Sequence, residues 1–430
     1  MADDTAREHR GSPVKILRIL TRLNIGGPAL HAALLTTRLD PRRFSTCLVV
    51  GEPDPTEGDL SGLVDTTSVR LIRLSSLRRP IRPWADALTW WSLLRIVWQE
   101  RPHLIHTHMA KAGALGRLAG LCYNTIGPGH TTGSRATLIH TFHGHVLEGY
   151  FPGWLSRVFL AAERWLARRT DCLIAVSQTI RDQLLAKGIG RADQWRIIPL
   201  GLDLSVLGTL PFPNGSSPIR FGMVGRLVPV KNPSLFLQAL SHLLQQQPGE
   251  GIAGVIVGDG PLRQSLERQA QQMPLGHAVS FTGWQRDLSL VYRQLDVACV
   301  TSWNEGTPVS LIEAMAAGRA VIATDVGGVR DLLAEPSEAR KAISRGSFQV
   351  VQRGVLVQAG DTEGLVAAMR RLAQDAPLRQ QVGAAGRAHV LRAFTAERLL
   401  QDVATLYERF LSGARVSSKA CEMQGVSCTP

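Results

Sequence analysis

Short apolar runs alternate with amphipathic stretches along the first half of the chain. The runs cover residues 14–20, 46–50, 104–106, 138–142 and 173–176, and turn residues or helical stretches such as 155–167 separate them. Alternation of short strands with helices is typical of βαβ units, which assemble into a parallel sheet. We therefore predict a doubly wound, Rossmann-like domain over residues 13–209.

The pattern breaks at LPFPNGSSP, residues 210–218, where proline, glycine and serine are typical of a linker. A second series of apolar runs follows, at 219–224, 255–257, 279–281, 297–301 and 320–322. We predict a second doubly wound domain over 218–395, a helix over 396–412 that returns to the first domain, and a disordered tail over 413–430. The expected fold class is thus α/β, with two Rossmann-like domains facing each other across a cleft. Ligands of such domains bind at the carboxyl ends of the strands.

The composition narrows the class of protein. Of 430 residues, 44% are hydrophobic and 19% are charged, which is typical of a globular chain with a large core. The six cysteines form no CxxC pair, and Cys172 and Cys299 lie in apolar runs, so we expect buried thiols in a reducing compartment. The opening MADDTAREHRGSP lacks the apolar segment of a secretory signal, and there is no apolar run of about 18 residues. These features predict a cytoplasmic protein without a spanning helix.

The net charge of +13 has several possible explanations. Surface arginines alone would account for it, and so would contact with an anionic membrane face, nucleic acid or an acidic substrate. Two stretches, residues 78–101 and 150–169, combine tryptophan with arginine. Both are compatible with helices that lie peripherally on the inner face of a membrane. Both are equally compatible with ordinary helices whose tryptophans belong mostly to the core.

The stretch from Val297 to Glu313 joins a buried strand to a helix through a small polar loop. Thr307 is placed to cap this helix, Pro308 suits its first position, and Gly318 ends it. The free backbone N–H groups at such a helix start bind phosphate or hydroxyl oxygens. The sequence therefore predicts an anion site at this loop.

Two carboxylates flank the predicted anion site. Glu305 precedes the helix, where accepting hydrogen bonds from sugar hydroxyls is a role that suits an acid. Glu313 lies one turn inside the helix, within reach of a ribose. Alternatively, both acids only stabilise the helix N-terminus through its dipole.

Two further loops suit a diphosphate. Arg226 follows Gly225 at the end of a predicted strand, and Lys231 comes five residues later. Such cations would neutralise a diphosphate leaving group as its bond breaks, although they equally fit a surface loop of a basic protein. Gly26 and Gly27 follow the first strand and allow the backbone to approach a phosphate closely. Their loop is not GxGxxG, so it is not a dinucleotide fingerprint.

Histidines gather near two of the predicted strands: His103, His106 and His108 near one, and His140, His143 and His145 near the other. Two such groups are compatible with a metal site. We expect no metal ion, because no cysteine or acid joins them at ligand spacing and the chain has no Asp-x-Asp triplet. We expect instead that one or two of these histidines line the cleft and bind polar substrate.

Six motifs in order resemble one family. EGTPVSLIEAMAAGRAVIATDVGG resembles the Glu-x7-Glu region of the family 4 (group 1) retaining glycosyltransferases, which have the GT-B fold. GRLVPVKN, IVGDGPLR, IPLGLD, NIGGP and HTFHGH are similar to other segments of that family. Together the motifs span about residues 14 to 400. One departure is Leu200, which stands where the family often has asparagine. A contact that the asparagine side-chain amide makes in the family is therefore not expected here.

The resemblance implies a role for each matching residue. The catalytic group would be His143, Glu305, Arg226 and Lys231, with His143 beside the reacting sugar and the two cations on the donor diphosphate. The implied donor-binding positions are Gly26, Gly27, Gly225, Arg226, Lys231, Trp284, Glu305, Gly306, Thr307, Pro308, Val309 and Glu313. Trp284 falls at the base-binding position and Glu313 at the ribose. His106, His108 and His145 would contact the acceptor.

The resemblance also implies the reaction. A sugar would move from a nucleotide-sugar donor to a hydroxyl of a lipid-linked or polysaccharide-precursor acceptor, with retention of configuration and without a cofactor or essential metal. UDP-sugar is the favoured donor and GDP-mannose the second. A GT-B sugar-nucleotide epimerase or hydrolase is the alternative enzyme. A nucleic-acid-binding protein is disfavoured because no RNA or DNA module is present.

Overall fold

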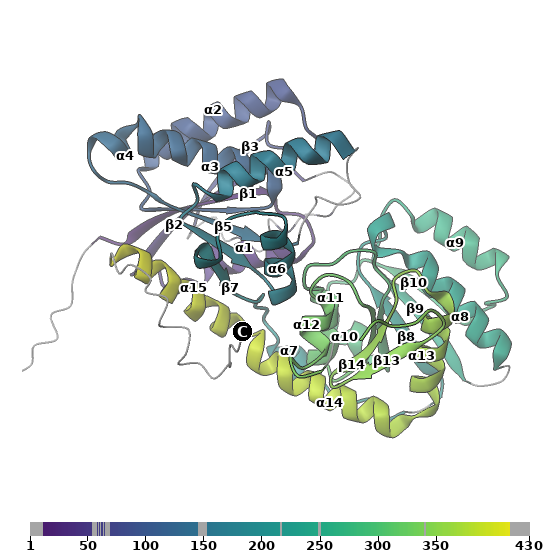
Figure 1. The fold of residues 1–430 in the computed structure, drawn as a ribbon. Helices are drawn as coiled ribbons and strands as arrows, with labels where there is room; N and C mark the ends of the chain where they lie inside the picture. Colours follow the sequence, from purple (N-terminus) through teal and green to yellow (C-terminus); the bar gives the residue numbers. More distant parts are fainter. Residues whose placement is uncertain are drawn as a thin grey trace, which may run out of the picture.

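The structure is a computed structural model that describes residues 12–412, except 54–57, 59, 61, 63, 65–68, 145–152, 216, 248–250 and 339–340. It contains two α/β domains side by side, joined by the 210–218 linker and by the last helices of the chain (Figure 1). The predicted tail over 413–430 lies outside the described residues, as do His145, Cys421 and Cys428.

The first domain is built on a seven-stranded sheet in the order β3-β2-β1-β4-β5-β6-β7, with every neighbouring pair parallel. The strands are β1 (Val14–Arg22), β2 (Phe44–Gly51), β3 (Arg70–Leu74), β4 (Leu104–His108), β5 (Thr137–Phe142), β6 (Cys172–Ala175) and β7 (Trp195–Ile197). The strand order reverses direction between β1 and β4. In a doubly wound sheet this reversal is where the ligand crevice opens.

Helices cover both faces of this sheet. They are α1 (Gly27–Thr37), α2 (Pro83–Glu100), α3 (Ala110–Thr125), α4 (Pro128–Thr131), α5 (Gly153–Ala167) and α6 (Gln178–Ala186), whereas the short α7 (Ser205–Gly208) packs in the core of the second domain. Successive residues of a strand point to opposite faces, and β1 demonstrates this. Ile16 belongs to one buried cluster with Leu35 of α1, whereas Leu17 belongs to another with Leu93 of α2.

The second domain repeats the plan with the order β10-β9-β8-β11-β12-β14-β13. Its strands are β8 (Ile219–Val224), β9 (Ile252–Val257), β10 (Val279–Gly283), β11 (Val297–Val300), β12 (Ala320–Thr324), β13 (Phe348–Val351) and β14 (Gly354–Val357). Its helices are α8 (Pro233–Gln246), α9 (Arg263–Gln272), α10 (Leu288–Arg293), α11 (Val309–Ala316), α12 (Val329–Leu333), α13 (Thr362–Gln374) and α14 (Ala376–Ala393). All neighbouring strands are parallel except β13 and β14, which form a hairpin. Two doubly wound domains were predicted, and the structure confirms them.

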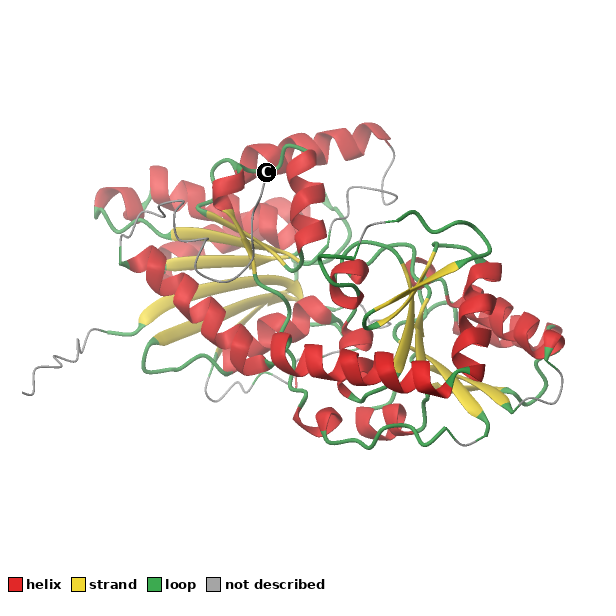
Figure 2. Ribbon diagram, turned by 60° about the horizontal axis from the view of Figure 1, so that its bottom comes forward, coloured by secondary structure: helices red, strands yellow, loops and turns green. Residues whose placement is uncertain are grey.

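The last helix, α15 (Ala396–Leu411), crosses from the second domain to the first (Figures 1 and 2). At the crossing, the Leu202 N–H donates to the Phe394 carbonyl at 2.9 Å and the Ala396 N–H donates to the Leu202 carbonyl at 3.0 Å. Farther along, Leu399 and Tyr407 are buried in the cluster that covers one face of the first sheet. The C-terminal helix therefore belongs to the core of the N-terminal domain.

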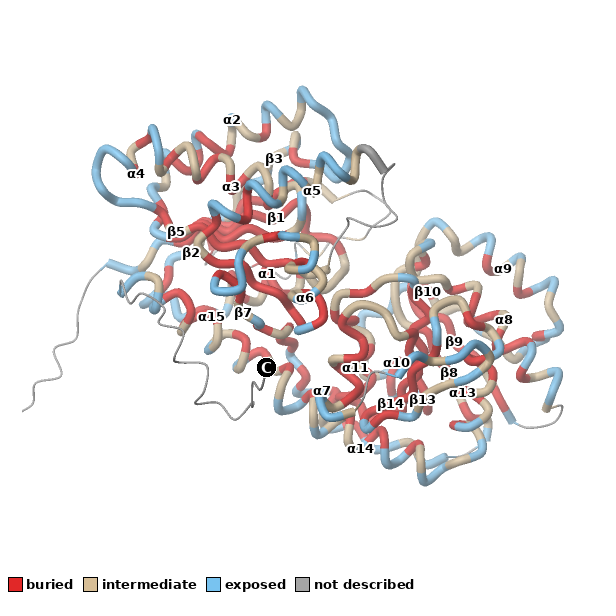
Figure 3. The backbone as a smooth tube through the Cα atoms, in the orientation of Figure 1, coloured by how far each residue is buried: buried red, intermediate tan, exposed pale blue. Residues whose placement is uncertain are grey.

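The two sheets are the most buried parts of the molecule, and exposed residues lie on the outer turns of the helices (Figure 3). Cys172 and Cys299 are buried free thiols, as predicted, and burial raises the pKa of Cys172 to about 12. No helix in the described ranges is long and apolar enough to cross a membrane.

Candidate active site

The loops singled out in the sequence lie at the carboxyl ends of the strands where each sheet reverses its order. Gly26 follows β1, Arg226 follows β8, and the loop over 301–308 follows β11. Figure 1 places α11 and α12 on the side of the second domain that faces the first. Both crevices therefore open toward the boundary between the domains.

Glu305 and Lys231 form an ion pair at the edge of the second domain. Lys231 Nζ donates to Glu305 Oε1 at 2.5 Å, and the hydroxyl of Ser302 donates to the same oxygen at 2.6 Å. The Glu305 side chain is 9% exposed. The Lys231 ammonium and the Ser302 hydroxyl therefore fix the orientation of the Glu305 carboxylate before a ligand binds. The sequence did not point to Ser302, since an isolated serine carries no signal.

Backbone and hydroxyl contacts hold the loops of this pair together. The Thr301 hydroxyl donates to the carbonyls of Lys231 at 3.0 Å and Asn232 at 2.9 Å, and the Trp303 N–H donates to the Val230 carbonyl at 2.8 Å. The loop after β8 and the loop after β11 are thus one unit. The position of Lys231 relative to Glu305 follows from the backbone rather than from side-chain attraction alone.

Two helix N-termini meet across the domain boundary. Helix α1 starts at Gly27 and helix α11 at Val309, and neither has a side-chain cap. A Cβ added to Gly27 would lie 3.2 Å from Val309 Cγ2, so the two helix starts are in contact distance. Uncapped N-termini present N–H donors and a positive dipole end, which together attract an anion.

The expected start of α11 was wrong by one residue. Pro308, not Thr307, is the N-cap, and the hydroxyl of Thr307 is buried without a hydrogen-bond partner among the described residues. The hydroxyl therefore does not cap the helix. Gly318 does end it, with φ 72° just past the C-cap, as predicted.

Glycine at 306 lets the two domains touch. A Cβ on Gly306 would lie 1.9 Å from the carbonyl oxygen of His143, and Gly144 lies against Gly306 as well. The Gly306 carbonyl also accepts a hydrogen bond from Gly328 at 2.8 Å. No side chain fits between these backbones. The structure therefore brings His143 directly onto the loop that carries Glu305.

The remaining donor-side residues lie around the same edge. The Gly225 N–H donates to the Val257 carbonyl at 2.9 Å, which ties the turn that carries Arg226 to the end of β9. Trp284 directly follows β10 and is 38% exposed, beside the 258–260 turn that bonds to Gly283.

Glu313 lies half-buried on α11, where the Tyr292 hydroxyl donates to its Oε2 at 2.8 Å. Burial raises the pKa of Glu313 to about 7, although the hydrogen bond from Tyr292 acts in the opposite direction. The carboxyl is therefore poised between its charged and neutral forms near neutral pH. Nothing in the sequence pointed to Tyr292.

The prediction that His106 contacts the acceptor is wrong. His106 is fully buried, and its two ring nitrogens are occupied by the Tyr407 hydroxyl at 2.6 Å and the Thr141 hydroxyl at 2.7 Å. His108 is fully buried as well and lies behind His143, so it does not form the cleft surface either. His145 lies outside the described residues.

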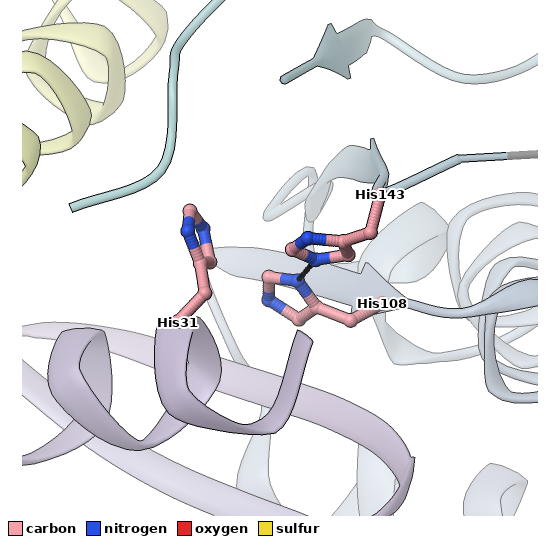
Figure 4. Close-up of side chains that lie close together, drawn as sticks. All are labelled: His31, His108 and His143. Atoms are coloured by element: carbon pink, nitrogen blue, oxygen red, sulfur yellow. Dashed lines mark hydrogen bonds between the residues drawn. The ribbon is translucent and has the colours of Figure 1, made fainter. Parts of the chain in front are cut away.

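A histidine that the sequence gave no reason to select, His31 of α1, joins His108 and His143 (Figure 4). The Nδ1 of His108 lies 3.1 Å from the Nε2 of His143, and the His31 ring centroid is 5.0 Å from that of His143. Burial lowers the pKa of all three rings well below the usual value, to about 3 for His143. The histidines are therefore neutral at physiological pH.

A second contact joins the domains beside this site. Asp331 of α12 accepts hydrogen bonds from both the backbone N–H and the hydroxyl of Thr179 on α6, each at 2.7 Å. These bonds connect the second domain to the first beside the site. The sequence contained no signal for this pair because its partners are 152 positions apart.

Two family profiles match the chain, one in each domain. The profile of the glycosyl transferases group 1 family matches residues 212–389, and that of the glycosyl transferase 4-like domain matches residues 26–201. The protein is a group 1 glycosyltransferase.

Curated relatives cover most of this glycosyltransferase. It is 26% identical over 330 residues to the UDP-Gal:alpha-D-GlcNAc-diphosphoundecaprenol alpha-1,3-galactosyltransferase of Escherichia coli, covering 74% of this chain and 78% of the relative. It is 27% identical over 350 residues to the D-inositol 3-phosphate glycosyltransferase of Nocardia farcinica, covering 74% and 70%.

Solved structures share the architecture of the glycosyltransferase. HepE from Anabaena, in complex with UDP, has a TM-score of 0.71 at 20% identity and covers 92% of this chain and all of its own. Sucrose-phosphate synthase from Thermosynechococcus elongatus has a TM-score of 0.73 at 21% identity, with 93% of this chain covered and 100% of its own. The predicted two-domain GT-B fold is confirmed.

Proposed function

We propose that this glycosyltransferase moves a sugar from a UDP-sugar to a hydroxyl of a lipid-linked or polysaccharide-precursor acceptor, with retention of anomeric configuration. One observation carries the proposal. The Lys231–Glu305 pair lies in the loop that leads into the uncapped N-terminus of α11, against the uncapped N-terminus of α1. An anion site beside a fixed carboxylate matches a ligand with a diphosphate at one end and hydroxyls at the other.

Each part of the site then has a role toward the donor. Lys231 and Arg226 neutralise the diphosphate, and the helix starts at Gly27 and Val309 supply backbone N–H donors. Glu305 accepts hydrogen bonds from hydroxyls of the transferred sugar. Glu313 accepts hydrogen bonds from the ribose.

The proposed reaction exchanges one bond for another at the anomeric carbon. The bond to the diphosphate oxygen breaks as the acceptor oxygen attacks from the same face, and the acceptor's proton passes to the departing phosphate oxygen. The nucleoside diphosphate leaves with both electrons of the broken bond. No protein base and no metal is needed, so the chain contributes positioning and charge stabilisation.

UDP is the preferred nucleotide because of the proteins that resemble this one. HepE is known in complex with UDP and with UDP-glucose. The name of the Escherichia coli relative specifies UDP-Gal as its donor and a diphosphoundecaprenol-linked sugar as its acceptor. GDP-mannose remains the second candidate donor.

A lipid-linked acceptor is supported by the outer surface of α2. Trp84 is 88% exposed, Leu88 64% and Trp91 56%, and together with Arg95 and Trp98 they recur at i, i+4, i+7, i+11 and i+14. They therefore form one exposed stripe on the helix, which we call the α2 stripe. Trp90 alone of the helix's tryptophans packs against the core, so of the two interpretations left open by the sequence, the one with mostly core tryptophans does not hold for α2.

Arginines accompany the α2 stripe, and helix α5 carries a further exposed tryptophan beside an arginine. Arg79 and Arg82 lie exposed before and at the start of α2, and on α5 Trp165 is half-exposed beneath the guanidinium of Arg169 at 4.2 Å. Apolar rings among arginines are typical of peripheral attachment to anionic lipid. We infer that the enzyme works at the cytoplasmic face of a membrane, where a lipid-linked acceptor is presented to the N-terminal domain.

The experiment that tests the donor site compares site variants on UDP-, GDP- and ADP-sugars. We expect Glu305→Gln and Lys231→Met each to lower the transfer rate by about 10²–10³-fold. Both variants should remain folded, because neither side chain belongs to a core cluster, with a lowered melting temperature in Lys231→Met, which leaves the Glu305 carboxylate without its ammonium partner. Glu267→Gln, which removes a carboxylate paired with Arg263 on α9 of the same domain, is the matched control and should keep its rate.

Two results would contradict the proposal. Near-normal transfer in both Glu305→Gln and Lys231→Met would remove the site assignment. Consumption of the donor at the same rate with and without any acceptor would instead indicate the epimerase or hydrolase alternative. A UDP-sugar that raises the melting temperature in proportion to its occupancy, while GDP- and ADP-sugars do not, would support the nucleotide assignment.

A further inference from the structure

We propose that His31, His108 and His143 form a binding site for a divalent transition metal of the Zn²⁺ type, and that the bound metal inhibits sugar transfer. The three side chains come from three different elements of the N-terminal domain: α1, the end of β4 and the residue after β5. Figure 4 shows their rings turned toward one another. Such convergence of buried imidazoles is a metal-binding arrangement even without an acid.

The spacing of the nitrogens suits a small coordination sphere. Each histidine offers one nitrogen, and these atoms all lie within 4.8 Å of one another. In a tetrahedral Zn²⁺ site with bonds of roughly 2.0–2.1 Å, ligand nitrogens are roughly 3.3 Å apart. The His108 and His143 nitrogens are already at 3.1 Å. A metal ion bound here would replace the hydrogen bond between these two nitrogens, and His31 would supply the third ligand and leave one open position.

The metal-free arrangement leaves polar atoms without partners. His31 Nδ1, His108 Nε2 and His143 Nδ1 are buried and have no hydrogen-bond partner among the described residues. An unpartnered buried nitrogen costs on the order of 1–3 kcal/mol. The unpartnered nitrogens of His108 and His143 are not the two that lie 3.1 Å apart, so they show that the surroundings are polar and under-satisfied rather than where a metal would lie.

The rings behind the cluster hold His108 in place. His106 lies against His108 with ring centroids 4.3 Å apart, and hydrogen bonds to Tyr407 and Thr141 fix His106 on both sides. Arg18 in turn donates to the Tyr407 hydroxyl at 2.9 Å. Ligands whose orientation is fixed by such outer contacts bind metal more tightly than free ones.

The type of ligand atom determines which metal ion the three histidines can bind. Among the residues that the structure describes, no carboxylate or thiol joins the three histidines, and the buried guanidinium of Arg18 opposes any cation. Mg²⁺ and Ca²⁺, which prefer oxygen ligands, should therefore not bind. Zn²⁺, Co²⁺ and Ni²⁺, which accept imidazole, should bind with moderate affinity.

Inhibition is the consequence for transfer, and this part rests on the proposed function. His143 touches Gly306 of the sugar-binding loop through its carbonyl, and its ring is the one proposed to lie beside the reacting sugar. A metal bound between the rings holds the His143 ring against His31 and His108, where it already lies, and so prevents it from turning toward the sugar. The proposed site replaces the expectation of no metal ion at these histidines. The inhibitory metal differs from a catalytic one, and transfer without an essential metal stays a prediction.

Calorimetric titration tests the binding. Tag-free, chelator-treated full-length protein is titrated with ZnCl₂, and Co²⁺ absorption in the visible range reports the coordination geometry. We expect one equivalent with a dissociation constant in the micromolar range or tighter, and the intense bands of four-coordinate Co²⁺. His31→Gln should weaken binding by at least about tenfold. The matched control, His103→Gln with His242→Gln, removes two exposed histidines and should bind as wild type.

Several outcomes overturn the proposal. The site is wrong if no stoichiometric Zn²⁺ binds, if Mg²⁺ binds equally well, or if the surface control weakens binding as much as His31→Gln does. Circular dichroism and melting temperature establish that His31→Gln is folded, and His31→Cys, which restores a ligand, should recover affinity.

Transfer assays test the inhibition. Zn²⁺ should inhibit wild type reversibly with chelator, and the half-inhibitory concentration in His31→Gln, normalised to its own rate, should rise by the same factor as its dissociation constant. Stoichiometric binding without inhibition overturns the inhibitory role. If no donor supports transfer at all, the proposed function fails, while the calorimetry still decides the metal site.

Discussion

Glu305 illustrates how a single residue can be costly for the fold and useful for function. A carboxylate that is 9% exposed loses most of its hydration, and Lys231 and Ser302 replace that hydration from one side. Such buried pairs contribute little net stability, because desolvation offsets most of the attraction. Their value here is a fixed geometry. A ligand hydroxyl meets an acceptor that needs no reorganisation.

Glu313 leads to a prediction about pH. In the folded chain its pKa is raised to about 7 from an ordinary 4.5. Between those values the folded chain holds a proton that the unfolded chain lacks, so stability falls as pH rises through this window and the full penalty is present above about 7. Glu313→Gln, which mimics the neutral form, should therefore be more stable than wild type by about 1–3 kcal/mol at pH 8 and equal to it at pH 4.

Urea unfolding of wild type and Glu313→Gln at pH 4, 6 and 8 measures this difference. Asp287→Asn is the control, since its carboxyl is exposed and its pKa is lowered by the hydrogen bond from Ser289. A stability difference in Glu313→Gln that does not change with pH would contradict the assignment. Donor affinity should fall in the same variant, because an amide accepts fewer ribose hydrogen bonds than a carboxylate.

At the scale of elements, hydrophobic periodicity identified the strands that are buried on both faces. β8 has the predicted bounds, and β1, β2, β4 and β5 differ from the predicted runs by at most two residues at either end. β3 and β7 were missed. β3 is a half-exposed edge strand with two arginines, and β7 is only three residues long. β13 and β14 were missed too, because four residues each in a hairpin do not form a distinct pattern.

The site was predictable where chemistry is local in the sequence and unpredictable where it is not. Glu305, Lys231 and the glycine turns lie in short motifs at strand ends, and the structure brings them to one edge. His31 lies mid-helix among alanines and leucines, and only the packing of α1 on the sheet reveals its neighbours. The misassignment of His106 has the same origin. Sequence cannot show that Tyr407, 301 positions away, occupies its ring.

Helix α2 supports a prediction about membrane binding. The α2 stripe offers Trp84 and Trp91 to lipid, and nearby arginines attract anionic headgroups. We expect the protein to co-sediment with phosphatidylglycerol vesicles at low salt and to be released at high salt. Trp84→Ser with Trp91→Ser should lower the partition coefficient roughly tenfold.

Leu290→Ser is the control for this experiment, since it removes a comparably exposed apolar side chain, 63% exposed, from the second domain. Binding should persist in that variant. If wild type stays in the supernatant even at low salt, the surface of α2 has another role. Neutral phosphatidylcholine vesicles separate the electrostatic part of the attachment from the apolar part.

At the scale of the whole molecule, three of the contacts between the described parts of the two domains differ in kind. Helix α15 ends in the core of the first domain, Gly306 contacts the backbone of His143, and Thr179 binds Asp331. The first is a permanent connection through the fold. The other two lie beside the site and involve few atoms, so they are suited to form and break as a donor enters and a product leaves.

The contact between Thr179 of the first domain and Asp331 of the second predicts how the approach of the two domains affects donor binding. Asp331→Ala removes the acceptor of two hydrogen bonds between the domains. We expect the donor KM to rise about tenfold. Without these bonds a smaller fraction of the molecules has the two domains close enough to bind the donor, and the apparent affinity for the donor falls in proportion to that fraction. At saturating donor the rate should change less, since bound donor restores the arrangement.

Asp182→Ala is the control, as its carboxylate bonds only within α6 to Gln178 and Arg181 among the described contacts. Steady-state kinetics measures the donor KM and the rate at saturating donor, and small-angle scattering measures the approach of the two domains. An unchanged KM, or a loss of rate that tracks a loss of melting temperature, would show that the contact serves stability rather than domain approach.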